Sequence, residues 1–221
     1  MYYFRENEVI MLKIEYYYHS MWRLETDNTS LVLDPYDDIG YPLPRGLTAD
    51  VVCSTHNHHD HNNFSLISGD FIKVNSVGDY KVGDFIITGY QTYHDKEQGA
   101  KRGENIIFKI GVAGINILHL GDLGHLLDDD LVDKIGEIDI LMVPIGGNYT
   151  IDANEAKAIT KKINPKILMP MHYHTGACKV DIADNHAFIQ GFDSVIKIPK
   201  MHVFLNELDF TKQNIYFFVE K

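Results

Sequence analysis

The sequence predicts an α/β fold with two similar halves in a single domain of 221 residues. Short apolar segments of strand length, separated by turns that contain glycine, occupy most of residues 11–119. Helical periodicity appears only after residue 120, where a strand, a helix and a further strand form a βαβ unit. The pattern of several strands followed by a helix therefore occurs roughly twice along the chain, which suggests two similar halves. We expect these halves to join near residue 110.

The first half is expected to open with antiparallel strands and to continue as a longer series of strands. Residues 1–10 precede this pattern and form a short extension or an extra strand. His19-Ser20 and the turn-like residues 27–29 separate the first three segments, and further turns are expected at 77–79 and 111–114. The expected strands are 11–18, 21–26, 30–34, 51–54, 71–74, 85–90, 105–110 and 115–120.

The second half contains the helices. Residues 152–163 have an apolar stripe at helical spacing, and Asp152 and Glu155 have the spacing of a capping box. Asn164-Pro165 ends this helix before the next strand. The expected helices are 128–135, 152–163 and 180–190, and the expected strands are 138–143, 166–169, 195–198, 203–205 and 215–219.

Composition and charge exclude several classes of protein. With 45% hydrophobic and 23% charged residues, the chain is globular rather than disordered. The formal charge of 20 − 31 = −11 repels phosphate backbones, so no nucleic-acid partner is expected. The sequence has no apolar run near the ~20 residues that cross a bilayer and no leader-like start, so we expect a cytoplasmic protein without a membrane partner. Homo-oligomerisation is left open.

Histidines are concentrated in one segment. Four of the twelve, His56, His58, His59 and His61, lie within six consecutive positions that contain the pattern H-x-H-x-D-H. In an extended or loop backbone, residues two apart point the same way, so His56 and His58 can bind one metal ion. Asp60 and His61 can then bind a neighbouring metal ion. This loop alone leaves both ions short of ligands, so further His or Asp side chains must return to it.

The chain offers such residues at the ends of three later strands. They are His94, Asp122 and His172, which follow the segments 85–90, 115–120 and 166–169. Asp95 is a competing oxygen ligand beside His94. The alternative interpretation is a solvated His-rich loop that binds metal accidentally.

These motifs together resemble the metallo-β-lactamase superfamily. Further segments, Leu33-Asp34-Pro35, residues 121–125, 143–150 and 169–173, resemble its branch of small metal-dependent hydrolases related to L-ascorbate-6-phosphate lactonase. The resemblance covers roughly residues 11–205. It implies an αβ/βα four-layer sandwich with two β-sheets flanked by helices.

The resemblance also implies a ligand set and an activity. His56, His58 and His94 would bind the first ion, Asp60, His61 and His172 the second, and Asp122 would bridge the two. One or two divalent ions (Zn, Mn, Fe or Ni) are expected, since these ligand types do not choose among them. We expect a hydrolase that uses a metal-bound hydroxide, oriented by Asp60, on a small-molecule lactone, ester, amide or phosphodiester. Whether this substrate is anionic is left open. The alternatives are a non-catalytic metal or anion-binding sensor and, less favoured, a nuclease.

Other polar residues have weaker signals. Asp34 and His19 are interpreted as residues that orient ligand imidazoles, with plain turn residues as the alternative. His174, two positions after His172, and Asn148, in a Gly-Gly-Asn turn, are candidate substrate contacts, with a rim histidine and an ordinary tight turn as the alternatives. Three more histidines have no assigned metal role. They are His59, expected to point away, His119, expected in the core, and His125, whose role stays open.

Overall fold

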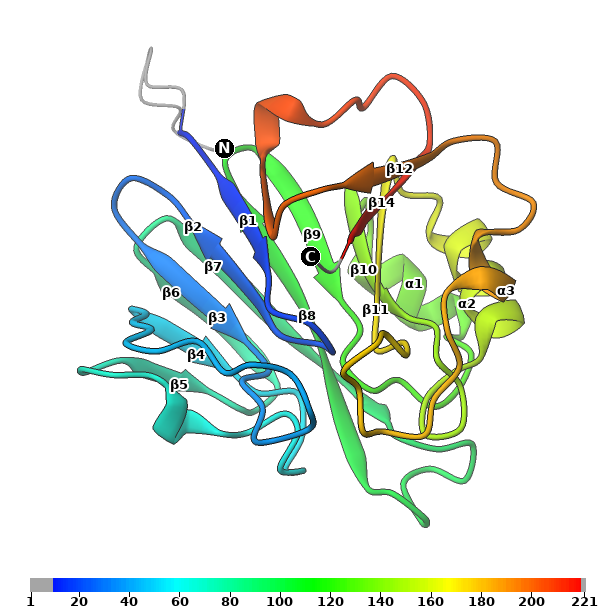
Figure 1. Ribbon diagram of the computed structural model, residues 1–221, viewed down its shortest axis with the longest axis horizontal. Coiled ribbons are helices and arrows are strands. Elements are labelled where there is room, and N and C mark those ends of the chain that lie inside the picture. Colours follow the sequence, from blue (N-terminus) through cyan, green and yellow to red (C-terminus); the bar gives the residue numbers. More distant parts are fainter. Residues whose placement is uncertain (1–9, 220–221) are drawn as a thin grey trace.

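The computed structural model describes residues 10–219, which form two β-sheets packed face to face (Figure 1). Nine of the ten residues of the expected N-terminal extension, 1–9, lie outside the described residues. The helices lie on the right-hand side of Figure 1, next to β10 and β11. The sheet that contains these two strands therefore separates the helices from the other sheet.

The first sheet has six strands in the order β13-β1-β2-β3-β4-β5. β1 to β3 are antiparallel, which confirms the predicted opening, whereas β4 and β5 continue in parallel. β13 returns from near the C-terminus and pairs with β1. The bounds are β1 (Lys13–Tyr16), β2 (Trp22–Glu25), β3 (Ser30–Leu33), β4 (Val51–Cys53), β5 (Ile72–Val74) and β13 (His202–Phe204).

The second sheet has eight strands in the order β12-β14-β11-β10-β9-β8-β7-β6. β6 to β9 form an antiparallel meander, while β9, β10, β11, β14 and β12 are parallel. The expected junction of the two halves near residue 110 falls within β8 and stays a prediction. The bounds are β6 (Gly78–Val82), β7 (Phe85–Tyr93), β8 (Glu104–Val112), β9 (Ile115–His119), β10 (Ile140–Pro144), β11 (Ile167–Met171), β12 (Val195–Ile198) and β14 (Asn214–Phe218).

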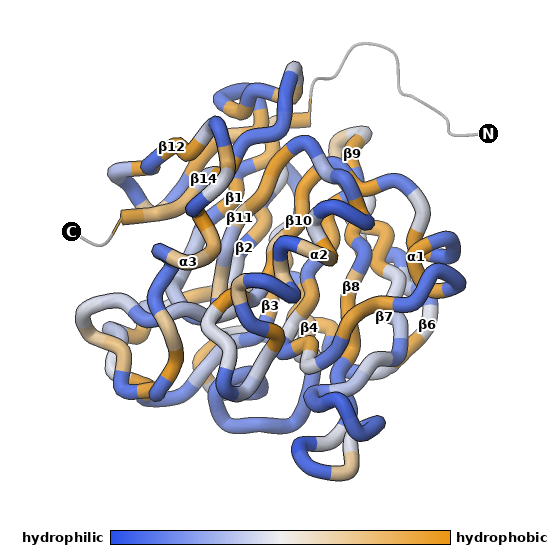
Figure 2. Tube along the Cα trace, turned by 90° about the vertical axis from the view of Figure 1, so that its right-hand side faces the viewer, coloured by the Kyte–Doolittle hydropathy of each residue, from blue (hydrophilic) through white to orange (hydrophobic). Residues whose placement is uncertain are grey.

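The main core lies between the sheets. Alternate side chains of the first sheet, such as Leu24 and Leu33, meet inward side chains of the second, such as Phe108 and Met142. The hydropathy of the chain follows this arrangement, since apolar strands are enclosed by more polar loops (Figure 2). Burial of both faces explains why β10 and β11 are apolar throughout.

The three α-helices of the described residues pack on the outer face of the second sheet, against residues such as Leu118, Leu141 and Leu168. The outer face of the first sheet is covered by residues of the 34–49 loop and by the 3-10 helix η1 (Phe64–Leu66), which pack on Val32 and Val52. The predicted two-sheet α/β sandwich is confirmed, with loops as the outermost layer on this side. The helices are α1 (Asp129–Ile135), α2 (Ala153–Ile163) and α3 (His186–Ile189). No helix among residues 10–219 is long and apolar enough to cross a bilayer.

Two local predictions were wrong. Of the turn expected at 77–79, Gly78 and Asp79 belong to β6, and β6 turns into β7 at the two residues Gly83-Asp84. β6 is a largely exposed edge strand, so it lacks the apolar alternation that identifies a strand. The helix expected at 180–190 is reduced to α3, because the preceding backbone bonds to neighbouring loops, with the Ala183 N–H donating to Gly146 O.

The helix with the strongest sequence signal is confirmed. The Asp152 carboxylate accepts from the N–H groups of Asn154 and Glu155, and the Glu155 carboxylate accepts from the N–H of Asp152. Asn164, in the left-handed region at φ 53°, ends α2 before the strand β11.

Candidate metal centre

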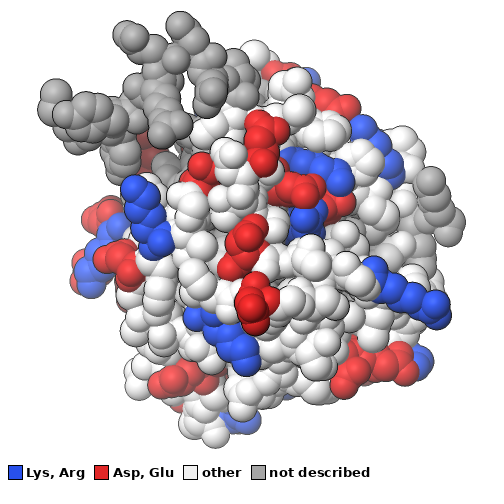
Figure 3. All heavy atoms as spheres, turned by 90° about the vertical axis from the view of Figure 1, so that its left-hand side faces the viewer, with Lys and Arg blue, Asp and Glu red and all other residues white. Residues whose placement is uncertain are grey.

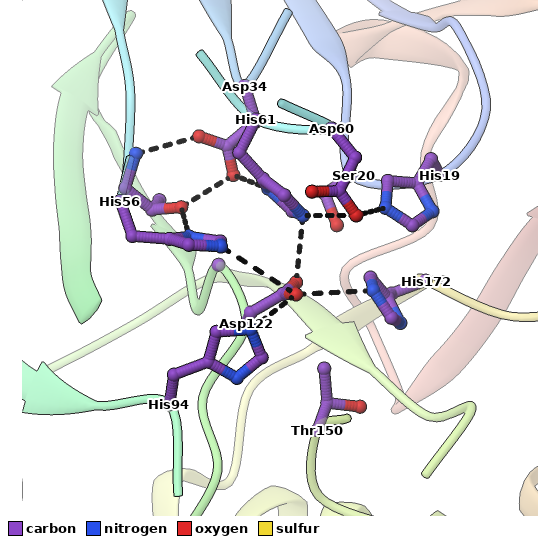
Figure 4. A network of polar contacts seen from close by, with 12 residues as sticks. His19, Ser20, Asp34, His56, Asp60, His61, His94, Asp122, Thr150 and His172 are labelled. Carbon is purple, nitrogen blue, oxygen red and sulfur yellow. Dashed lines mark hydrogen bonds and ion pairs between the residues drawn. The ribbon is translucent and has the colours of Figure 1, made fainter. Parts of the chain in front are cut away.

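Four loops bring histidine and aspartate side chains together at one edge of the sandwich. The loop after β4 carries residues 56–61, and His94, Asp122 and His172 follow β7, β9 and β11. In Figure 4 side chains from different elements point toward a common centre, namely those of His56, Asp60, His61, His94, Asp122 and His172. The cluster therefore joins segments that lie far apart along the chain.

The Asp122 carboxylate lies at the middle of the cluster. Its Oδ2 is 3.1 Å from His94 Nε2 and 3.3 Å from His172 Nε2, and its Oδ1 is 3.2 Å from His61 Nε2. His56 Nε2 is 4.0 Å from Oδ2 (Figure 4). One buried carboxylate thus faces imidazoles from all the other loops.

The possible ligand atoms fall into three overlapping groups, within each of which they lie no more than 4.8 Å apart. One group is His56, His58 and His94, and another is His56, His61 and Asp122. The third is Asp60, His61 and His172 together with His19. The first and third groups contain the two triads that the sequence resemblance implied.

Hydrogen bonds to Asp34 determine the tautomers of two rings. Asp34 Oδ2 accepts from the Thr55 hydroxyl at 2.8 Å, so that hydroxyl has no second proton and must accept from His56 Nδ1 at 3.0 Å. Asp34 Oδ2 also accepts from His61 Nδ1 at 2.9 Å. In its neutral form, each ring therefore turns a lone pair on Nε2 toward the centre, as metal-bound imidazoles do.

Buried atoms without hydrogen-bond partners concentrate at this place. In the described part of the chain, ten buried side-chain nitrogen or oxygen atoms lack a partner, and six of them belong to the cluster. Each unmet polar atom costs about 1–3 kcal/mol in a folded protein. His56 Nε2, His61 Nε2 and Asp122 Oδ1 face the centre of the cluster, where a divalent ion would satisfy them, so the residues present fit a metal. The six are His19 Nδ1, His56 Nε2, His61 Nε2, His94 Nδ1, Asp122 Oδ1 and His172 Nδ1.

The environment keeps three of the rings neutral at pH 7. Burial lowers the pKa of His56, and the neighbouring His61 acts in the same direction. Burial and the nearby His94 also lower the pKa of His58. Burial, reinforced by His172, lowers the pKa of His19 to about 4. Neutral imidazole is the form that binds metal ions.

The carboxylates of the cluster stay ionised. Burial by itself would raise the pKa of Asp122, but His172 and His61 hold it well below the ordinary value. Burial likewise opposes the ionisation of Asp60, but the hydrogen bond from His19 and the neighbouring His61 together outweigh it and lower the Asp60 pKa. For His61, burial favours the neutral ring, whereas Asp122 and Asp34 raise its pKa. The centre thus attracts positive charge, either a proton or a metal cation.

Unusual backbone conformations position several members. His19 and His172 have φ values of 53° and 49°, and the His172 N–H donates to the His19 carbonyl at 2.8 Å. Gly146 lies so close that a Cβ there would be 2.3 Å from the His172 carbonyl oxygen. A Cβ at Gly124 would meet the backbone of His94 and Asp95 at 2.3 Å. These glycines permit the loops to approach one another.

Asp95 is not placed as a ligand. Its side chain is buried, and it accepts four hydrogen bonds from backbone N–H groups of the loop that follows. The donors are Glu97, Gly99, Lys101 and Arg102. Its carboxylate therefore organises this loop, and the oxygen ligand that faces His94 is Asp122.

The remaining histidines lie outside the three groups. His119 is a buried core residue that accepts from the Gly121 N–H at Nδ1 and donates from Nε2 to Ser20 O, as expected. His125 accepts from the Tyr93 N–H, which ties two loops together. His59 is exposed and points away from the cluster, as alternation indicated.

The structure does not bring the two candidate substrate contacts into the cluster. His174 is exposed, because His172 already adopts a left-handed conformation and the alternation expected for a strand stops there. The Asn148 amide donates to the Asp181 carbonyl at 2.8 Å and so fastens its own loop. His19, in contrast, lies closer than expected, with its ring centroid 4.2 Å from that of His172.

Sequence reasoning missed two supporting residues. Asn105, fully buried in β8, accepts from the Asp122 N–H and donates to Leu120 O, which shapes the Asp122 loop. Its signal was an amide at the start of an apolar strand. Thr55, the residue before the histidine motif, links Asp34 to His56. No local pattern distinguishes this threonine from others.

Residues 13–172 match the family model described as the beta-lactamase superfamily domain. A relative from Carboxydothermus hydrogenoformans, named UPF0173 metal-dependent hydrolase, is 28% identical over 198 residues, which cover 74% of this chain and 85% of the relative. The residues that match the family model include every proposed ligand position from His56 to His172.

Two solved structures have the same architecture. A Thermotoga maritima protein assigned as a Zn-dependent hydrolase of the metallo-beta-lactamase superfamily is 34% identical, with a TM-score of 0.79 over 94% of this chain and 98% of that one. A metallo hydrolase from Ignicoccus hospitalis is 23% identical and has a TM-score of 0.58 over 75% of this chain and 84% of that one. The second similarity concerns the fold alone.

Proposed function

Because this chain belongs to the beta-lactamase superfamily, we propose that it is a metal-dependent hydrolase that acts on a small molecule with two divalent ions in the cluster around Asp122. The observation that carries the proposal is the convergence of buried imidazoles from the other loops on the Asp122 carboxylate, where His56 Nε2, His61 Nε2 and Asp122 Oδ1 have no hydrogen-bond partner. No hydrogen bond within the described part of the protein satisfies these three atoms, and metal ions would satisfy them.

The ligands divide between two positions. His56, His58 and His94 would hold one ion. Asp60, His61 and His172 would hold the other, and we add His19 to this set because its atoms lie within the same group. Asp122 lies between them, where its negative charge reduces the repulsion between two close cations. Zn, Mn, Fe and Ni all suit nitrogen and carboxylate ligands.

The chemistry would be hydrolysis of a lactone, ester, amide or phosphodiester. Bound divalent ions would lower the pKa of water toward 7 and polarise the carbonyl or phosphoryl oxygen of the substrate. Asp60 would accept a hydrogen bond from the attacking water and so orient it. His19 Nε2 lies 3.3 Å from Asp60 Oδ2, so the two side chains face the same position. Among these substrate classes, the resemblance to ascorbate-6-phosphate lactonase favours a lactone as the substrate.

A small-molecule substrate fits the surface better than a nucleic acid. Acidic and basic side chains are mixed over the face drawn in Figure 3, without a continuous basic stripe among its described residues. With a net charge of −11, long-range attraction to a phosphate backbone is absent. We also propose the cytoplasmic location that the sequence led us to expect.

Metal analysis of the purified protein tests this proposal. We expect one to two transition-metal ions per chain, and loss of at least one in His58→Ala, Asp60→Ala and His19→Ala. The exposed neighbour His59 supplies the control, since His59→Ala should keep the wild-type metal content. Unchanged metal content in all three variants would contradict the ligand set.

Turnover is tested with a panel of esters, lactones and phosphodiesters in the presence of Mn, Zn, Ni or Fe. We expect Asp60→Asn to lower kcat by at least about 100-fold while the fold is retained, which is the usual size for loss of a general base. A protein that binds metal but turns over no member of the panel would instead favour the sensor alternative.

A further inference from the structure

A pocket of about 390 Å³ opens beside the first metal position. His56 and His58 form part of its wall, so a molecule in the pocket lies next to the proposed metal site. Three side-chain amides, Asn57, Asn62 and Asn75, also line it. Its size is within the range of small-molecule sites in proteins.

Arg102 contributes the positive charge of the pocket. Among residues 10–219, no carboxylate lies within ion-pair distance of its guanidinium, and the side chain is half-buried. Its guanidinium carbon lies 5.4 Å from the ring centre of Tyr149, which comes from the loop after β10. Stacking leaves the N–H edges of a guanidinium available for a ligand.

The backbone around Arg102 is held firmly. Asp95 accepts from the N–H of Arg102 at 2.7 Å and from that of Lys101 at 2.9 Å. The next carbonyl, that of Gly103, accepts from the N–H of His94 at 3.0 Å. Because one loop fixes both His94 and Arg102, the cationic side chain has a defined position relative to the proposed metal ligand. Such preorganisation is typical of a binding residue.

We propose that Arg102 binds an anionic group of the substrate, a carboxylate or a phosphate, in this pocket, and thereby makes the hydrolase selective for anionic small molecules. The inference rests on the proposed function for the reaction, but the anion site itself rests on the pocket. Guanidinium is suited to both groups, because its fork of N–H donors matches their oxygen atoms. In a chain with a net charge of −11, Arg102 would add to the positive charge of the metal ions in attracting such a substrate.

Glu104 limits the charge that the pocket accepts. Glu104 lines the same pocket as Arg102, and its negative charge would repel a second negative charge on the ligand. Removal of this charge should strengthen anion binding. Loss of Arg102 should weaken anion binding, whereas loss of the Glu104 charge should strengthen it. A general loss of structure would weaken binding in both variants, so the opposite signs identify an anion site.

Calorimetric titration of the metal-loaded protein with phosphate and, separately, with succinate tests the anion site. We expect Arg102→Ala to weaken binding of at least one probe by about 10- to 100-fold, as loss of a charged hydrogen bond does. Glu104→Gln should tighten the same binding, and the probe with the larger Arg102 dependence identifies phosphate or carboxylate as the preferred group. Lys101→Ala is the matched control, because this exposed neighbour pairs with Glu97.

The proposal is overturned if the wild-type protein binds neither probe, or if Arg102→Ala binds both as tightly as the wild type. A hydrolysis assay with an ester that carries a free carboxylate and with its carboxamide analogue separates this outcome from failure of the proposed function. Arg102-dependent binding without hydrolysis of either compound would contradict the hydrolase alone. Equal hydrolysis of both by the wild type would contradict only the selectivity.

Discussion

Asp34 orients two of the clustered imidazoles although it does not face the centre itself. It bonds directly to His61 and reaches His56 through the Thr55 hydroxyl (Figure 4). Its φ of 46° places it in the left-handed region, which aspartate and asparagine tolerate better than most residues. A single side chain thus determines which nitrogen of each ring is available to a metal.

At the residue scale, we predict that Asp34→Asn lowers metal affinity by about 10- to 100-fold, the usual effect of losing a residue that orients a ligand histidine. Asp34 accepts from the Thr55 N–H at Oδ1 and from the Thr55 hydroxyl and His61 Nδ1 at Oδ2. An amide has an NH2 group in place of one oxygen and no charge, so it loses part of this set while it tolerates the same backbone. Competition with a chelating dye measures the affinity, and Asp193→Asn, at an exposed position, is the control. Equal affinity in both variants would refute the orienting role.

At the scale of elements, the loop from Asp95 to Gly103 depends on one buried carboxylate. Burial opposes the charge of Asp95, but hydrogen bonds from four backbone N–H groups lower its pKa to about 2, from an ordinary value of 3.8. The loop is thereby ordered without a helix or strand of its own. It carries both His94 and Arg102, so the metal site and the proposed anion site share this support.

We predict that this loop makes folding stability depend on pH below about 4. A carboxyl group with a lowered pKa in the folded state stabilises the protein above its unfolded pKa, and this contribution disappears as pH falls from about 4 to 2. Asp95→Asn should therefore be less stable than the wild type at pH 7, and the difference should shrink toward pH 2. Urea unfolding of both metal-free proteins across this range measures it, and a constant difference would contradict the explanation.

At the scale of the whole molecule, the sandwich brings the four loops to one edge. β4 belongs to the first sheet, whereas β7, β9 and β11 belong to the second, so the cluster spans both sheets. A metal ion bound there would connect the two sheets as well as serve the reaction. Metal binding should therefore stabilise the folded chain as a unit.

We predict that removing metal with a chelator lowers the melting temperature. One site saturated at a hundred times its dissociation constant adds about 2.7 kcal/mol, which is roughly 5–10 °C for a chain of this size. Differential scanning calorimetry before chelation, after it and after metal is restored measures the change. His58→Ala should show a smaller shift, and identical melting temperatures with and without metal would count against an ion between the sheets.

The sequence alone predicted the features that depend on neighbouring residues. The capping box of α2, the apolar strands and the H-x-H-x-D-H segment follow from spacing along the chain, because alternation and helical periodicity are local properties. The isolated residues His94, Asp122 and His172 were identified from strand ends together with a resemblance. Their convergence required the sheets to pack, and the structure describes it.

Only the tertiary structure decided the roles of residues whose partners are distant in sequence. His19 lies among the ligand atoms and His174 does not, although the sequence suggested an orienting role for His19 and a substrate contact for His174. Asp95 organises a loop, and Arg102 enters a pocket beside His58. The physical reason is that spacing determines which way a side chain leaves its own strand, whereas the packing of two sheets determines what that side chain then meets.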